Sequence, residues 1–101
     1  MTLKNKPKAV LSPLAYNDLK KLPGNARRQV IVAIDGLEVD LRPSNTKRLT
    51  IEGEAREVRR LRLEKWRIIY LVFEERPIIL GIRKRPPYGY DDIQHLVQEV
   101  D

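Results

Sequence analysis

The stretch that decides the fold is Val58–Phe73, which reads VRRLRLEKWRIIYLVF. Over residues 58–63 arginine alternates with aliphatic side chains, the two-residue period of a half-buried strand. Residues 66–73 are rich in aromatic and β-branched side chains, as a central strand is. Glu64 and Lys65 leave room only for a tight turn between the two segments. We therefore predict a β-hairpin here.

Alternation also assigns the charged side chains of this hairpin to a face. Arg60 and Arg62 point the same way, away from the leucines of their strand, which should lie toward the core. On the next strand, Arg67 shares a face with aliphatic and aromatic neighbours, namely Ile69, Leu71 and Phe73. Several guanidinium groups are therefore expected to converge on one concavity near the end of the sheet.

The sequence beyond the hairpin predicts one more strand and a last helix. Glu74–Pro77 is a polar turn, and Ile78–Ile82 is the third strand of an antiparallel meander. Pro86-Pro87 ends this strand because proline cannot extend the hydrogen-bonded ladder. Asp91 is placed to cap an amphipathic helix, and its apolar side chains are Ile93, Leu96, Val97 and Val100.

The sequence before the hairpin predicts a strand and two helices. Residues 8–11 are a short apolar strand, and Ser12-Pro13 is a helix start that combines a capping side chain with proline at the first position. Pro23-Gly24 ends this helix, Asn25 is placed to cap a second one, and Arg42-Pro43 stops it. The order β-α-α-β-β-β-α predicts an α+β domain over residues 1–101. A helical hairpin packs on one face of a mainly antiparallel four-stranded sheet, and the other face stays partly open.

Size and composition exclude several classes of protein. A chain of 101 residues holds one domain with one modest core. It contains no cysteine, which excludes disulfides and thiolate metal sites. No apolar run approaches the roughly 20 residues of a membrane span, and the first residues lack the apolar core of a signal peptide. We expect a cytoplasmic protein with no membrane partner.

The charge is positive and unevenly distributed. The net charge is +6 and the sequence pI is about 9.8. Residues 56–90 hold ten basic and four acidic side chains, whereas residues 91–101 hold four acidic and no basic ones. Clustered cations in a domain of such a pI indicate a nucleic-acid partner. An acidic protein partner would be attracted by the same surface.

The residue types near the end of the last strand suit RNA. Arg83 and Arg85 are expected to share a face with Gly81 and Ile79, and guanidinium grips a phosphodiester with a bidentate fork. Two aromatic rings, Tyr88 and Tyr90, follow directly, and rings beside cations suit stacked, unpaired bases. The further candidate RNA-binding residues are Lys47, Arg48, Arg59, Lys65, Arg83 and Lys84.

Each feature also has a simpler interpretation. Alternating arginines often form only the solvated face of a strand, and Arg67 has Glu57 and Glu64 as possible ion-pair partners. Trp66 is expected to pack in the core, and His95 is not expected to be catalytic. The pair Asp91-Asp92 is explained by helix capping without any metal. No glycine-rich phosphate loop, histidine metal cluster or nucleophilic triad is present, so neither a metal nor a cofactor is expected.

Taken together, the motifs resemble the RelE/ParE toxin superfamily over about Val10 to Tyr90. The segments that carry the resemblance are Asp18–Leu22, Arg27-Arg28, Lys47–Leu49, Val58–Tyr70 and Ile82–Tyr88. The most recognisable is the aromatic-Arg-hydrophobic-hydrophobic-Tyr run from Trp66 to Tyr70. The fold that this resemblance implies, a helical hairpin on an antiparallel sheet, agrees with the pattern analysis above.

The RelE branch implies a ribosome-dependent endoribonuclease that cleaves mRNA in the A site without a metal. The 2′-hydroxyl of the substrate attacks the adjacent phosphate, and the implied partners are the ribosome, mRNA and a cognate antitoxin. By this resemblance Arg67 stabilises charge on the phosphate, and Tyr88 or Tyr90 stacks on a base or assists proton transfer. The other residues matched to the catalytic set are Arg60, Arg62 and Arg85.

Two departures leave the general base unassigned. Val58 stands where RelE carries a lysine, and Lys84 stands where many relatives carry a histidine. Two alternatives therefore stay open. One is a ParE-like toxin that poisons DNA gyrase, although such proteins usually lack the clustered cations and the closing tyrosine. The other is a non-catalytic module that binds nucleic acid through its charge alone.

Overall fold

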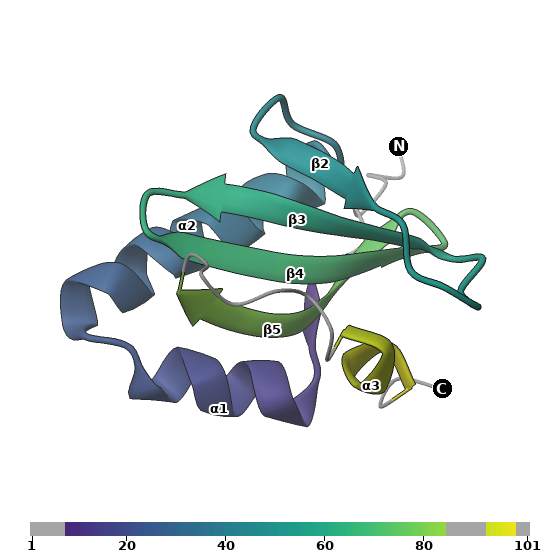
Figure 1. Cartoon of the computed structure of the whole chain (residues 1–101). Coiled ribbons are helices and arrows are strands. Elements are labelled where there is room, and N and C mark those ends of the chain that lie inside the picture. The colour runs from purple at the N-terminus through teal and green to yellow at the C-terminus, as the bar shows by residue number, and fades with distance from the viewer. Residues whose placement is uncertain (1–7, 85–92, 99–101) are drawn as a thin grey trace.

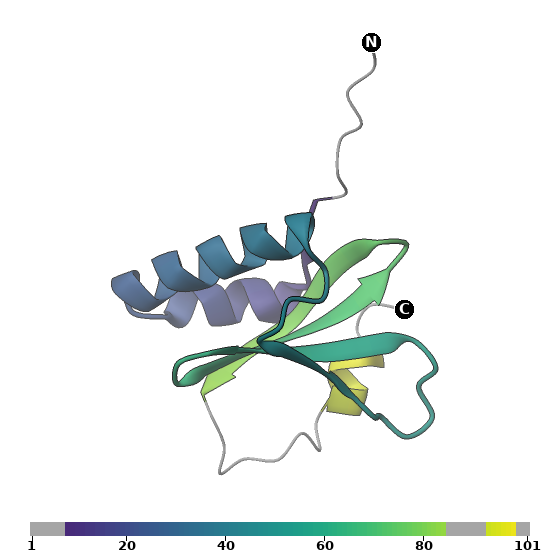
Figure 2. The ribbon, with the colours of Figure 1, turned by 90° about the horizontal axis from the view of Figure 1, so that it is seen from above.

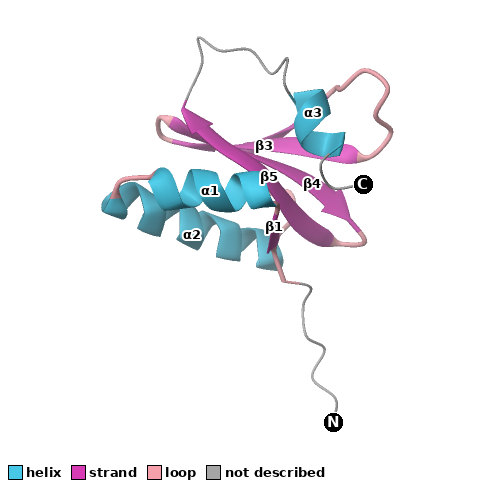
Figure 3. Ribbon diagram, turned by 90° about the horizontal axis from the view of Figure 1, so that it is seen from below, coloured by secondary structure: helices cyan, strands magenta, loops and turns pink. Residues whose placement is uncertain are grey.

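The computed structural model describes residues 8–84 and 93–98 (Figure 1). Within these residues, three helices and one five-stranded sheet follow in the order β1 (Val10–Leu11), α1 (Pro13–Lys21), α2 (Gly24–Val39), β2 (Thr46–Leu49), β3 (Glu57–Leu63), β4 (Trp66–Phe73), β5 (Arg76–Lys84) and α3 (Ile93–Gln98). The strand order in the sheet is β1-β5-β4-β3-β2. Helices α1 and α2 pack on one face and α3 on the other (Figures 2 and 3). The predicted α+β class is confirmed. None of the described helices has the length and apolarity needed to cross a membrane.

The central meander forms as the alternating pattern predicts. Strand β3 pairs antiparallel with β4, and β4 pairs antiparallel with β5. The second turn is shorter than expected, since β5 begins at Arg76 and Pro77 lies within it, opposite Val72. Glu74 and Glu75 alone make this turn, and both have positive φ angles, 54° and 59°. The boundary predicted at Ile78 was therefore wrong by two residues.

A fifth strand, β2, was missed by the sequence analysis, which predicted four. Its four residues pair antiparallel with β3, Lys47 opposite Arg60 and Leu49 opposite Val58. The segment has no apolar alternation of its own, so periodicity could not reveal it. It forms because the edge of β3 offers a row of unpaired backbone groups.

The helical hairpin follows from its capping residues with one correction. Ser12 caps α1 as predicted, because its side chain accepts a hydrogen bond from the Ala15 N–H at 3.1 Å. Helix α2 begins at Gly24 and is preceded by Pro23, which makes no side-chain cap. The prediction that Asn25 caps α2 was wrong, since Asn25 lies within the first turn. Arg27, in the first turns of α2, caps the C-terminal end of α1. Its guanidinium donates a hydrogen bond to the Leu22 carbonyl at 2.9 Å.

Two apolar clusters lie on opposite faces of the sheet. The larger joins the helical hairpin to the sheet through residues such as Val30, Leu37 and Tyr70, all fully buried. The smaller lies under α3, where Ile93 and its helical neighbours cover Val58 and the residues around it, namely Ile69, Leu71 and Leu80. The face opposite the hairpin, predicted to be partly open, is therefore closed at one end by α3.

A β-bulge on β5 divides these two clusters. Ile69 pairs with Gly81 and Tyr70 with Ile79, so one residue of β5, Leu80, has no opposite partner on β4. Ile79 consequently faces the helical hairpin, while Leu80 faces α3. The expectation that Ile79 shares a face with Arg83 was wrong, because the extra residue breaks the two-residue alternation.

Candidate nucleic-acid interface

Three arginines lie side by side across the sheet, on the face that α3 partly covers. Arg62 of β3 is directly opposite Arg67 of β4, and Arg67 is directly opposite Arg83 of β5. Residues opposite each other in an antiparallel pair lie on the same face with their Cβ atoms about 4.5–5.5 Å apart, and like charges in that position are destabilising. We call these three residues the arginine row.

Two further cations extend the arginine row toward the edge of the sheet. Arg60 shares the face of Arg62 and lies opposite Ile69, and Lys47 of β2 lies opposite Arg60. The prediction that Arg60, Arg62 and Arg67 share one face is therefore confirmed. The arginine row with Arg60 and Lys47 is called the cationic face below.

Arg67 is the most constrained member of the cationic face. Only 5% of the residue is exposed, and it is the one charged residue that the described part of the chain buries. Its Nη1 donates to the backbone carbonyls of Glu64 at 2.7 Å and Trp66 at 2.8 Å. These bonds tie the guanidinium to the β3–β4 turn.

Of the two carboxylates considered as partners of Arg67, Glu57 pairs with Arg42 at 2.8 Å and with Arg59 at 3.0 Å. Hydrogen bonds from Arg42 hold the pKa of the Glu57 carboxyl below its usual range, with a smaller contribution from Arg59. Glu64 contacts Arg67 through its backbone carbonyl. The two backbone carbonyls that accept from Nη1 therefore help to orient the buried guanidinium.

Arg60 carries an unsatisfied donor within the cationic face. Its Nε is buried and has no hydrogen-bond partner in the described structure. A buried polar group without a partner costs about 1–3 kcal/mol, more when it is charged. An anionic oxygen at this point would supply the missing acceptor.

The other predicted RNA-binding residues lie away from the cationic face. Arg48 and Arg59 are opposite each other on the side of the helical hairpin, and Arg59 donates to Thr46 Oγ1 at 3.1–3.2 Å. Lys84 lies opposite Trp66, on that same side. Lys65 is in the β3–β4 turn, with its Nζ 5.8 Å from the centre of the Trp66 ring. The structure thus places Arg48, Arg59 and Lys84 on the other face of the sheet from the arginine row, and Lys65 in the turn beside the row.

Solved structures provide the comparison that bears on this arrangement. The chain superposes on RelE in a RelE–RelB complex from Pyrococcus horikoshii with a TM-score of 0.71 and 22% identity, covering 83% of this chain and 100% of that one. For a RelBE toxin–antitoxin complex from Mycobacterium tuberculosis the TM-score is 0.67 and the identity 21%, and the superposition covers 80% of this chain and 100% of that one. For the isolated RelE toxin of E. coli the TM-score is 0.64 and the identity 14%, and the superposition covers 94% of this chain and 99% of that one. The chain has the RelE fold. No protein-family model matches it, and no curated protein matches it in sequence.

In this RelE fold the two aromatic residues of the Trp66–Tyr70 run are structural. Trp66 is buried in the larger apolar cluster, as predicted. Tyr70 is fully buried on the side of the helical hairpin, where its hydroxyl donates to the Leu41 carbonyl at 2.6 Å. Burial raises the pKa of the Tyr70 hydroxyl above its usual range. Tyr70 therefore cannot act as a base on the cationic face.

Three predicted site residues, Arg85, Tyr88 and Tyr90, lie outside the described residues, as do Asp91 and Asp92. Arg83 and Lys84 immediately precede this group at the end of β5. Among the residues that the structure does describe, no cluster of histidine, aspartate or glutamate is arranged to hold a metal ion. His95 is exposed on α3, a helix that the sequence analysis did not link to catalysis.

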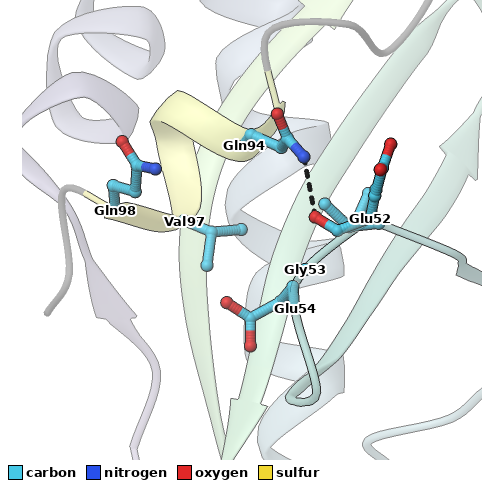
Figure 4. Close-up of a pocket in the computed structure, with 7 residues that line it drawn as sticks. Glu52, Gly53, Glu54, Gln94, Val97 and Gln98 are labelled. Atoms are coloured by element: carbon cyan, nitrogen blue, oxygen red, sulfur yellow. Dashed lines mark hydrogen bonds between the residues drawn. The ribbon is translucent and has the colours of Figure 1, made fainter.

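A pocket at the other end of the RelE fold is lined by acidic residues in place of cations (Figure 4). It has a volume of about 200 Å³ and lies between α3 and the β2–β3 loop. Gln94 closes one side of it by donating to the Glu52 carbonyl at 2.7 Å, and Glu54 lines the wall, hydrogen-bonded to Arg56 at 2.9 Å. No sequence motif marks this pocket, because its lining comes from two segments about 40 residues apart. Its carboxylates do not suit RNA, so the cationic face is the candidate site.

Proposed function

We propose that this chain is the toxin of a toxin–antitoxin pair and a ribosome-dependent endoribonuclease, which cleaves mRNA in the A site without a metal. The observation that carries the proposal is the arginine row, in which Arg62, Arg67 and Arg83 lie directly opposite one another on adjacent strands. Such an arrangement opposes folding. It is consistent with selection for a multiply charged anion such as the RNA backbone.

The structural neighbours support the toxin role and its partner. All four of the cited neighbours are described as complexes of RelE with RelB or as RelBE complexes, and three of them as toxin–antitoxin complexes. We infer that this chain likewise binds a cognate antitoxin, and its net charge of +6 favours an acidic one. An mRNA-cleaving toxin acts in the cytoplasm, together with the ribosome.

The proposed reaction needs charge stabilisation above all. The 2′-oxygen attacks the adjacent phosphorus and the bond to the 5′-oxygen of the next nucleotide breaks. This leaves a 2′,3′-cyclic phosphate and a free 5′-hydroxyl. Negative charge builds on the phosphorane in between, and fixed donors that face it lower the barrier. Arg67, held by two backbone carbonyls, is such a donor, and the buried Nε of Arg60 is a second.

Proton transfer falls to other residues. One proton leaves the 2′-hydroxyl and one is gained by the departing 5′-oxygen. Arginine, with a pKa above about 12, is a poor base. Tyr70 is excluded by its burial on the other face. We assign the proton transfer, or the stacking on a base that precedes it, to Tyr88 or Tyr90, with Arg85 as a further phosphate contact.

The test is primer extension on an mRNA translated by purified ribosomes. The wild-type chain is expected to produce discrete breaks within A-site codons that require ribosomes. Arg62→Ala and Arg67→Ala should each lower the cleavage rate by about 10²–10³-fold, by analogy with the loss of one oxyanion donor. Arg48→Ala removes the same charge from the opposite side of the sheet and should cleave like wild type. Circular dichroism establishes that each variant is folded.

Wild-type cleavage by both arginine variants would reject the role of the arginine row. Intact mRNA under conditions in which the protein still arrests growth would reject the nuclease. In that case, inhibition of DNA supercoiling by purified gyrase would identify a ParE-like toxin. Binding of RNA without cleavage or growth arrest would identify a non-catalytic module.

A further inference from the structure

The backbone groups along the outer edge of β5 form hydrogen bonds with several different partners in turn. Strand β1 pairs with β5 only at Ile78 and Ile79. Ser12 then continues the edge, because its N–H donates to the Ile79 carbonyl at 2.9 Å and its hydroxyl to the Leu80 carbonyl at 3.3 Å. Beyond this point the chain has turned into α1, and among the described residues no further strand accompanies β5 on that side.

Asp18 takes the place of the missing strand. Its Oδ2 accepts a hydrogen bond from the Ile82 N–H at 3.0 Å, across 64 residues of sequence. Ile82 is buried, and a buried N–H without a partner is costly. A carboxylate is a stronger acceptor than the carbonyl that a strand would supply. Asp18 is the one acidic residue of α1, and it is half-buried against β5.

The bond lies immediately beside the arginine row. Ile82 stands between Gly81 and Arg83 in β5. A Cβ atom built on Gly81 would lie 3.5 Å from Asp18 Oδ2, 3.8 Å from Arg83 Nη2 and 3.4 Å from Leu96 Cδ1. The carboxylate and the guanidinium therefore both border the small space that the glycine leaves.

We propose that Asp18 is a positioning residue for Arg83. It fixes the backbone of β5 at Ile82 and thereby holds the guanidinium of Arg83 in line with Arg67. This inference rests on the proposed nuclease function and extends it to a residue on the helical hairpin. It accounts for an acidic side chain in a helix whose other charges, Lys20 and Lys21, are basic.

Two substitutions separate the hydrogen bond from the charge. Asp18→Ala removes the acceptor and should lower the single-turnover cleavage rate on ribosomes by about 10–100-fold, since a shift of about 1 Å in a catalytic group can cost about 10²-fold. The KM for the programmed ribosome should stay within about twofold. Asp18→Asn keeps an oxygen that accepts from Ile82 and should remain within about threefold of wild type. Asp35→Ala, which removes an exposed carboxylate from α2, is the matched control and should have no effect.

A double-mutant cycle distinguishes positioning from a general loss of stability. In an Arg83→Ala background, Asp18→Ala should change the rate by less than about twofold, whereas in an Arg60→Ala background it should show its full effect. Equal effects of Asp18→Ala in both backgrounds would overturn the proposal. Loss of cleavage in a folded Asp18→Asn variant would overturn it as well. If Asp18→Ala does not fold, Asp18→Asn is the variant that decides.

NMR tests the positioning role of Asp18 without relying on cleavage activity, so the test remains valid if the proposed function is wrong. The NMR signals of the Ile82 amide and the Arg83 Nε–H should both shift in Asp18→Ala and stay near their wild-type positions in Asp35→Ala. If the wild-type chain cleaves nothing, the nuclease proposal fails, yet these shifts still decide whether Asp18 positions Arg83. Unchanged Arg83 signals in Asp18→Ala would reject the positioning role whatever the activity.

Discussion

Arg67 shows how the middle of the arginine row is held in place. It is 5% exposed and lies between two other arginines. The backbone carbonyls of Glu64 and Trp66 accept hydrogen bonds from its Nη1, and these bonds orient the guanidinium. If the proposed function holds, we expect this fixed donor to stabilise the charge that develops on the phosphate.

Glu54 gives a prediction at the residue scale. Arg56 donates to its carboxylate from the side chain and the backbone, which lowers the pKa of Glu54 to about 2. A carboxyl whose pKa is lower in the folded state stabilises the fold above its unfolded value of about 4.3, and this contribution is lost as the pH falls toward 2. Glu54→Gln should therefore be less stable than wild type at pH 7, and the difference should shrink steadily between pH 5 and pH 2. Urea denaturation across that range measures it.

The control for Glu54 is in the same loop. Glu52 is exposed, so Glu52→Gln removes one negative charge without removing the contact to Arg56. A pH-independent difference between wild type and Glu54→Gln would show that the ion pair with Arg56 does not contribute to folding.

At the scale of elements, the β4–β5 turn is the least favourable local structure in the sheet. Glu74 and Glu75 both have positive φ angles, a region in which Asn and Gly are preferred in two-residue hairpin turns. Non-glycine residues there cost on the order of 1–3 kcal/mol each. The sequence analysis predicted a turn here from polarity, but its strain is visible only in the backbone angles.

Replacing this turn should stabilise the fold. Glu74→Asn combined with Glu75→Gly is expected to raise the free energy of unfolding by about 1 kcal/mol, the strain relieved less the extra entropy of glycine in the unfolded chain. Urea denaturation measures the gain. The matched control is Glu64→Asn with Lys65→Gly, because in that turn only Glu64 has a positive φ angle. An equal gain in both turns would contradict the explanation.

On the scale of the whole molecule, the arginine row and a group of glutamates lie at opposite ends of the sheet. The α1–α2 connection, the β3–β4 turn and the end of β5 lie at one end, and Figures 1, 2 and 3 agree on this. That end carries the arginine row. The β2–β3 loop, the β4–β5 turn and α3 lie at the other end, where the acidic residues are Glu52, Glu54, Glu74 and Glu75. If the proposed function holds, we expect the end with the arginine row to attract the nucleic acid.

Salt dependence tests which face of the sheet binds RNA. Each phosphate contact to a single strand contributes about −0.7 to the slope of log K against log salt. Lys47→Ala should make the slope for a single-stranded RNA shallower by about 0.7, because Lys47 lies on the cationic face opposite Arg60. Arg48→Ala, one residue along the same strand, should leave the slope unchanged. Fluorescence anisotropy measures both, and a larger change for Arg48 would place the RNA on the other side of the sheet.

The sequence by itself determined the α+β class, the β3–β4 hairpin, the Ser12 cap and the common face of Arg60, Arg62 and Arg67. These features depend on local periodicity and capping, which neighbouring residues encode. They are the features that the structure confirms.

Only the tertiary structure decided the rest. Strand β2 and the bulge at Leu80 depend on pairing with neighbours distant in the sequence, so no local pattern announces them. The alignment of Arg83 with Arg67, and the bond from Ile82 to Asp18 across 64 residues, arise because β5 packs between β4 and the helical hairpin. Periodicity assigns a side chain to a face of its own strand, whereas register and packing choose which other side chains it meets there.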